Sequence, residues 1–180
     1  MKTFKSTGRA TWQAFYQYLR IPLALLLFCS SAALAQAAKT EVETKAEREK
    51  HLFALLDRYL DAVNQVELQA VTDTYHFPHI RIVNNKVTIW QTPQEAMPML
   101  NLPKEEQEAA MRDGLGPDWH HTEWEYRRLL SHSDNKAHVD TALLRYNSKG
   151  DMITRFESLY ILTRENGVWA IKGRSSFAPR

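Results

Sequence analysis

The sequence predicts an α+β domain in which N-terminal helices cover one face of an antiparallel sheet formed by the C-terminal third. Three observations support this class. The four runs 123–130, 137–146, 152–163 and 168–177 read as extended strands. Turn residues separate them, including Asn166-Gly167, a pair that suits a type I′ hairpin turn. Upstream, one long amphipathic helix supplies the apolar cover that such a sheet needs.

The first 35 residues are typical of a cleaved secretory signal. Basic residues without any acid precede the short apolar segment 21–28, and small residues follow up to Ala35. An uncleaved membrane anchor is the alternative, but it needs about 20 apolar residues. We therefore expect cleavage near Ala35-Gln36, a flexible lead-in over 36–44, and a periplasmic or secreted domain over 45–180 without a stable membrane anchor.

The charge balance argues against a nucleic-acid-binding domain. The whole chain is +2, but the predicted signal holds four of the 23 basic residues and none of the 21 acidic ones. The remaining part is therefore net acidic, whereas a nucleic-acid binder keeps a basic patch in its folded domain. The only cysteine, Cys29, also lies in the signal. The domain is thus expected to have no disulfide and no thiol chemistry.

Two helices are expected at the start of the domain. Apolar residues recur with helical spacing between positions 52 and 63, which predicts a helix that begins at Lys45. A shorter helix is expected from about Val66 to His76. It should end there because Pro78 follows closely, and the residue before a proline favours an extended backbone.

A hairpin and a broken helix are expected to follow. Alternating residues over 79–83 and 86–90 flank Asn84-Asn85, a pattern that predicts two short strands joined by a tight turn. Thr92 is a good N-cap with Pro93 at the first helical position. The helix that begins there should be interrupted near Pro98 and resume over 103–113.

The mature chain resembles the nuclear transport factor 2-like superfamily, which includes polyketide-cyclase-like (SnoaL-like) proteins, ketosteroid isomerase and scytalone dehydratase. The helix over 52–63, the Tyr75-His76-Phe77-Pro78-His79 segment and the closing strands 157–161 and 166–171 carry the resemblance. It implies a cone-like, bent antiparallel sheet, made of a four-stranded meander plus a short hairpin, wrapped around about three N-terminal helices. It also implies a pocket at the wide end and, as often in this superfamily, a homodimer through the sheet face. The fold hosts enzymes, binding modules and assembly domains, so it does not fix the function.

The isomerase mechanism found in that superfamily is not supported by this sequence. By resemblance, ketosteroid isomerase carries a carboxylate base in its early strands, but no acid occurs here between Asp73 and Glu95. The polar residues in this stretch are His76, His79 and Arg81.

The two histidines are the candidate catalytic residues. A histidine with an ordinary pKa of about 6.5 exchanges protons at neutral pH. By resemblance to scytalone dehydratase, His76 or His79 would act as general base, with Asp140 or Glu157 as its partner. The alternative is that His76 caps the second helix and His79 fills a polar gap.

Aromatic and polar residues of the strands are expected to line a cavity for a small apolar or aromatic molecule. Strand alternation puts Trp124 and Tyr126 on one face of the sheet. Arg174 is suited to hold a carboxylate or phosphate, or else to pair with Glu157. The alternative is that the tryptophans belong to the core. The expected ligand-pocket residues are Arg81, Trp90, Trp119, His121, Trp124, Tyr126, Tyr160, Arg174 and Ser175.

No motif predicts a metal or a cofactor. The histidines His76, His79, His120 and His121 fit no zinc-binding spacing, and no P-loop, catalytic serine motif or glycine-rich dinucleotide turn is present. Two function hypotheses remain: an exported small-molecule-binding or accessory domain, and a cofactor-free lyase or isomerase. We favour binding, because the spacing of the residues fixes no acid–base pair.

Overall fold

The computed structural model describes residues 44–178, so the predicted signal over 1–35 and nearly all of the predicted lead-in lie outside the described residues. From Thr44 onward the chain forms one compact unit. Its elements, in order, are α2 (Lys45–Asn64), α3 (Leu68–Asp73), β1 (Tyr75–Val83), β2 (Lys86–Trp90), α4 (Pro93–Ala96), the 3-10 helix η1 (Pro98–Asn101), α5 (Lys104–Leu115), β3 (His121–His132), β4 (Lys136–Tyr146), β5 (Met152–Glu165) and β6 (Val168–Ser176).

Helix α2 begins and packs as its sequence predicts. The Thr44 hydroxyl accepts a hydrogen bond from the Glu47 backbone N–H, and the Glu47 carboxylate accepts one from the Thr44 N–H, which closes a capping box. Leucines at i, i+3, i+4 and i+8 then fall on one face and are buried against the sheet, forming the centre of the core. The predicted helix is therefore confirmed.

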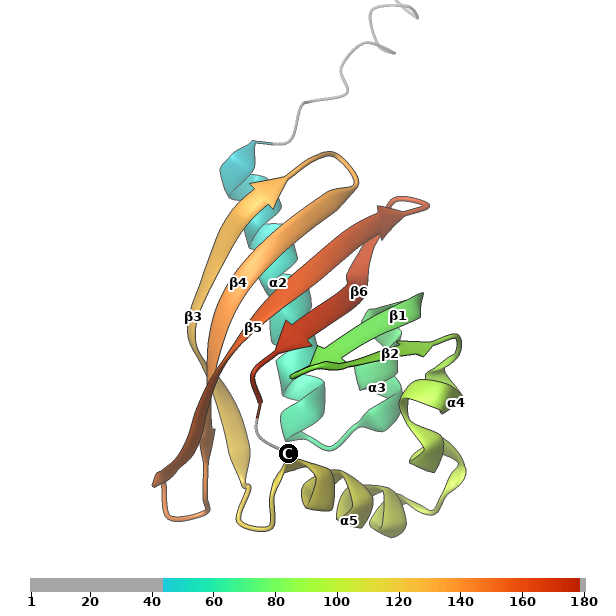
Figure 1. The fold of residues 1–180 in the computed structure, drawn as a ribbon, viewed down its shortest axis with the longest axis vertical. Coiled ribbons are helices and arrows are strands. Elements are labelled where there is room, and N and C mark those ends of the chain that lie inside the picture. Colours follow the sequence, from blue (N-terminus) through green and yellow to red (C-terminus); the bar gives the residue numbers. More distant parts are fainter. Residues whose placement is uncertain (1–43, 179–180) are drawn as a thin grey trace, which may run out of the picture. The chain divides into compact units, whose positions relative to one another are not determined.

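The six strands form one curled sheet in the order β2-β1-β6-β5-β4-β3, and α2 runs behind it in Figure 1. The predicted hairpin (β1–β2) and the predicted meander (β3–β6) are both present. They are joined by a parallel pairing of β1 with β6, in which Arg81 lies opposite Arg174. Gly173 permits this close approach, since a Cβ there would lie 3.1 Å from the Ile80 carbonyl oxygen.

The second helix is shorter than predicted, and the first strand starts earlier. Helix α3 ends at Asp73 and β1 already begins at Tyr75, three residues before Pro78. The Thr74 hydroxyl donates to the Val71 carbonyl, and the Thr74 carbonyl accepts from the Ile171 N–H at 2.8 Å. This hydrogen bond to β6 favours the sheet over another helical turn, which local sequence alone did not reveal.

A bulge in β3 makes the predicted alternation wrong. The register shifts between Trp124 and Tyr126. Trp124 packs against the core, whereas Tyr126 lies on the outer face beside Arg128. Arg127 consequently points inward, where it donates to the Phe53 carbonyl and pairs with Asp57 of α2. One extra residue thus reverses the faces of the strand up to Leu129, after which the register shifts again.

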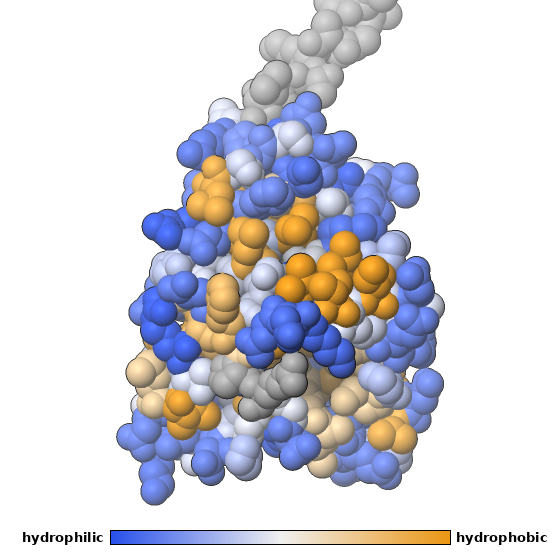
Figure 2. All heavy atoms as spheres, in the orientation of Figure 1, coloured by the Kyte–Doolittle hydropathy of each residue, from blue (hydrophilic) through white to orange (hydrophobic). Residues whose placement is uncertain are grey.

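On the outer face of the sheet, Figure 2 shows hydrophilic residues around the edges and a hydrophobic patch near the centre. Ion pairs join Arg128 to Asp140 and join Arg155 to both Glu125 and Glu157 on this face. Within residues 44–178, no helix combines the length and the hydropathy that a membrane crossing requires.

Candidate functional site

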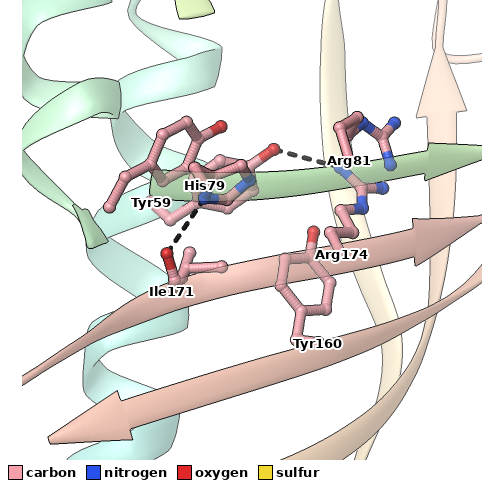
Figure 3. Close-up of a pocket in the computed structure, with 7 residues that line it drawn as sticks. Tyr59, His79, Arg81, Tyr160, Ile171 and Arg174 are labelled. Atoms are coloured by element: carbon pink, nitrogen blue, oxygen red, sulfur yellow. Dashed lines mark hydrogen bonds between the residues drawn. The ribbon is translucent and has the colours of Figure 1, made fainter. Parts of the chain in front are cut away.

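A small pocket lies between α2 and the inner face of strands β1, β5 and β6. Figure 3 shows its side chains pointing toward one another from these elements. Its volume is about 10 Å³, close to the lower limit for holding one water molecule. We call it the central pocket; its lining residues are Tyr59, Tyr75, His79, Arg81, Tyr160, Ile171 and Arg174.

Arg174 is held in the central pocket by the hydroxyl groups of tyrosine and serine, without a carboxylate partner among the described residues. Its Nη1 donates to the Tyr59 hydroxyl at 3.0 Å, and its Nη2 and Nε donate to Ser158 Oγ at 3.0 and 3.2 Å. The guanidinium carbon also lies 4.9 Å from the centroid of the Tyr160 ring, a cation–π contact. These contacts fix the position of the guanidinium group without neutralising its charge.

Arg81 enters the same pocket from β1, directly beside Arg174 in the sheet register. Burial, followed by the nearby positive charge of Arg174, lowers the pKa of Arg81. Arginine nevertheless stays protonated at any physiological pH. Burial also opposes the charge of Arg174, but the surrounding tyrosines outweigh it and raise the pKa of Arg174. The central pocket therefore contains two positive charges.

Two polar atoms in the central pocket are buried without a hydrogen-bond partner. They are Arg81 Nη1 and the Tyr160 hydroxyl, two of the four such side-chain atoms among residues 44–178. The Tyr59 hydroxyl is close enough to that of Tyr160 to affect its pKa, but the pair does not meet the geometry of a hydrogen bond. A buried polar group without a partner costs about 1 to 3 kcal/mol. Their concentration at one place is typical of a site whose partner comes from outside the chain.

His79 forms the floor of the pocket in a stack of rings. It lies 4.0 Å from Tyr75 and 5.6 Å from Trp90, measured between ring centroids, with the rings nearly parallel. Its Nδ1 lies 3.0 Å from the Ile171 carbonyl oxygen, so Nδ1 carries the proton and Nε2 the lone pair. Burial lowers the pKa of His79 to about 4. The ring is therefore neutral at pH 7.

The structure brings together four of the residues expected in the site: His79, Arg81, Tyr160 and Arg174. Two further aromatic residues of the expected set border them. Trp90 stacks on His79, and Trp124 makes an edge contact with Tyr160 at 5.9 Å.

The expected acid partners do not reach the pocket. Asp140 and Glu157 lie on the outer face of the sheet, where they pair with Arg128 and Arg155. The expected pairing of Arg174 with Glu157 is therefore wrong. The cause is strand alternation: Glu157 lies between the buried residues Phe156 and Ser158, so its side chain points to the opposite face.

The other expected residues also lie elsewhere. His76 contacts Thr163 at 2.9 Å and Glu165 at 3.6 Å. Trp119 is a core residue that donates to Thr122, and His121 stacks on Tyr146. Tyr126 and Ser175 lie on the outer face, Tyr126 because of the β3 bulge and Ser175 because it follows the inward Arg174.

Sequence reasoning missed Tyr59, Tyr75 and Ile171. Tyr59 falls within the apolar pattern over 52–63 and Tyr75 within the predicted second helix, so neither was a site candidate. The available signal was chemical: each is a tyrosine among aliphatic residues, and a buried hydroxyl usually has a polar partner. Nothing in the local sequence marks Ile171 as a pocket residue.

A larger hollow, of about 340 Å³, lies between the end of α5 with the segment that follows it and strands β4 and β5. Residues 113–118 form one side, and Arg145, Ile153 and Thr154 form the other. It contains none of the expected site residues, and one side of it is the end of α5 with the loop after it. The central pocket is the better candidate, since its polar groups converge from rigid strands.

Among the residues that the structure describes, no three His, Cys, Asp or Glu side chains are grouped as metal ligands. The two arginines of the central pocket would themselves repel a cation. The chemistry of this pocket is therefore that of hydrogen-bond donation and positive charge, applied beside aromatic rings.

Comparison with known proteins identifies the fold. The profile of a family described as "NTF2-like protein (DUF6841)" matches residues 48–176. A search of curated proteins finds no match.

Solved structures show the same fold. An NTF2-like protein of unknown function from Shewanella oneidensis has 16% identity and a TM-score of 0.51, and the match covers 73% of this chain and 99% of that one. A protein of unknown function with a cystatin-like fold from Nostoc punctiforme has 11% identity and a TM-score of 0.57, over 76% and 93%. An NTF2-like protein from Novosphingobium aromaticivorans has 12% identity and a TM-score of 0.55, over 84% and 88%. At these identities, the likeness shows the fold alone.

Proposed function

This chain belongs to the NTF2-like protein family DUF6841, and on that premise we propose that its domain binds a small molecule in the central pocket. The observation that carries the proposal is the pair of buried, unpartnered polar atoms, Arg81 Nη1 and the Tyr160 hydroxyl. A ligand that accepts hydrogen bonds from both would remove the cost of leaving them unpaired.

Binding is better supported than catalysis. A lyase or isomerase would use His79 as general base through Nε2, but efficient general bases have a pKa near the working pH. The pKa of His79 is about 4, and no carboxylate lines the pocket to raise it. His76 faces Thr163 and Glu165 instead. Catalysis as a lyase or isomerase is therefore the second candidate function.

The proposed ligand differs from a purely apolar one. The aromatic walls suit a flat molecule, as the sequence suggested, but the pocket also presents donors and positive charge. With about 10 Å³ open, a ligand can insert only a small polar group unless neighbouring side chains move. The rest of the molecule would then lie outside the pocket.

A fragment screen by ligand-observed NMR tests the proposal. The panel should contain neutral and charged fragments of one to three rings, together with small acids and amides. Tyr160→Phe removes the unpartnered hydroxyl and keeps the ring, whereas Tyr126→Phe makes the same change on the outer face and is the control. We expect fragments whose binding weakens in Tyr160→Phe and is unchanged in Tyr126→Phe. Fragments that bind all three proteins equally, or none at all, would contradict the proposal.

We also propose that the domain is exported and that it forms a homodimer. Export rests on the signal features of residues 1–35, and a homodimer would use the outer face of the sheet. That face carries the half-buried apolar residues Leu144, Leu159 and Ile161 beside its ion pairs. N-terminal sequencing of the secreted protein and sedimentation analysis are the respective measurements.

A further inference from the structure

The charge of the central pocket is not balanced within the described residues. Arg81 and Arg174 are neighbours across the β1–β6 pair, and no carboxylate lines the pocket. The hydrogen bonds of Arg174 go to the side-chain oxygens of Tyr59 and Ser158 rather than to a carboxylate. Partly buried arginines usually have an anionic partner, because burying an unpaired charge is costly.

The remaining lining residues do not supply a negative charge at neutral pH. Burial keeps His79 neutral, and burial raises the pKa of both Tyr75 and Tyr160 well above the ordinary value. Tyr59 differs: burial opposes its ionisation, but Arg174 and Arg81 outweigh burial and lower its pKa. A Tyr59 phenolate is therefore the internal alternative to an external anion, and a test must separate the two.

The size of the pocket limits the group that enters it. A volume of about 10 Å³ admits an atom or group about as large as a water molecule. One oxygen of a carboxylate meets this limit and a chloride ion, slightly larger than water, comes close to it, whereas a whole phosphate with its four oxygens does not. Arginine is also well suited to carboxylates, which it can bind through two parallel hydrogen bonds.

From this geometry we propose that the central pocket binds a compact monoanion between Arg81 and Arg174, with Arg81 Nη1 and the Tyr160 hydroxyl as its unused donors. The anion is either free in solution or the carboxylate of a small organic acid. This inference rests on the proposed function and names the charge of the ligand. An aromatic carboxylic acid would combine this charge with the ring stack beside it.

The test is an NMR titration of the purified protein in a buffer whose only anion is bulky. The titrants are chloride, acetate and benzoate, together with acetamide and benzamide as uncharged counterparts of the two acids. We expect saturable shifts of the backbone signals of Arg81, Tyr160 and Arg174 with the anions and none with the amides. Strong binding of chloride would identify a free anion, and benzoate binding more tightly than acetate would identify an organic acid. Either result supports a monoanion site.

Variants provide the control. Arg81→Met should weaken anion binding about tenfold or more, which is the effect of losing one charge-assisted hydrogen bond. Arg58→Met removes a charge from an exposed position on α2 and should leave binding unchanged. Loss of binding in both variants would indicate a nonspecific charge effect and overturn the inference.

Two other outcomes also overturn it. If benzamide binds in the pocket as tightly as benzoate, the inference fails while the proposed small-molecule function stands. If the tyrosinate absorbance of the wild type at neutral pH disappears in Tyr59→Phe, the pocket balances its own charge and needs no anion. Failure of the proposed function looks different, because then no fragment, charged or neutral, distinguishes Tyr160→Phe from Tyr126→Phe.

Discussion

Replacing Arg81 with methionine is expected to stabilise the unliganded domain. The Arg81 Nη1 atom is buried without a hydrogen bond, and such a donor costs about 1 to 3 kcal/mol. Arg81 is only partly buried, so the lower part of this range applies. Methionine keeps an unbranched apolar stem of similar length, so the packing of the stem is largely retained. We therefore expect Arg81→Met to gain about 1 to 2 kcal/mol.

Equilibrium unfolding in urea measures this gain. With a slope of about 2 kcal/mol per molar, the midpoint should rise by about 0.5 to 1 M at an unchanged slope. The buffer must contain only a bulky anion, because a bound small anion would stabilise the wild type and mask the effect. Arg58→Met is the control, since exposed substitutions usually change stability by no more than about 0.5 kcal/mol.

The reasoning would be refuted by a loss of stability. If Arg81→Met unfolds at a lower urea concentration than the wild type while Arg58→Met does not, the guanidinium group stabilises the empty pocket. The stabilising effect of the Arg81 guanidinium group would then explain its buried position without a functional site. If Arg81→Met is instead more stable than the wild type but no longer binds anions, Arg81 lowers stability and provides binding. Residues of functional sites commonly show this trade-off.

The remaining predictions concern pH, sheet packing and the core. Because the pKa of His79 is about 4 in the folded protein and about 6.5 in the unfolded chain, protonation favours unfolding. Stability should fall by roughly 3 kcal/mol between pH 6.5 and 4, and urea unfolding across this range should show a much smaller fall in His79→Asn than in His76→Asn. Gly173→Ala should cost about 1 to 3 kcal/mol in thermal unfolding because its Cβ would press on the β1 backbone, whereas Gly114→Ala, with open space around it, should be neutral or stabilising. Leu56→Ala, at a fully buried position, should cost about 2 to 5 kcal/mol; a cost below 1 kcal/mol would contradict the assigned core.

The sequence predicted the elements of the fold well where a local signal decides them. The stripe of leucines in α2, the Thr92 cap before Pro93 and the Asn166-Gly167 turn each depend on residues a few positions apart. Strand runs with turn residues between them likewise indicated the meander. The family resemblance added the curl of the sheet, which no local pattern contains.

The candidate site was predicted only in part, because face assignments depend on register. His79, Arg81, Tyr160 and Arg174, residues of polar or aromatic type on the early and closing strands, lie together at the central pocket, and their binding of a ligand stays a prediction. Tyr126 was assigned to the wrong face because a bulge in β3 cannot be read from alternation.

Local sequence alone thus determined the helices, the hairpins and the residue types available for a site. The tertiary structure alone decided that β1 pairs in parallel with β6, which sets Arg81 beside Arg174 although they are far apart in the chain. The physical reason is that strand pairing and burial depend on contacts between distant segments, and a pattern of neighbouring residues does not record them. The positive charge of the pocket is a consequence of that pairing.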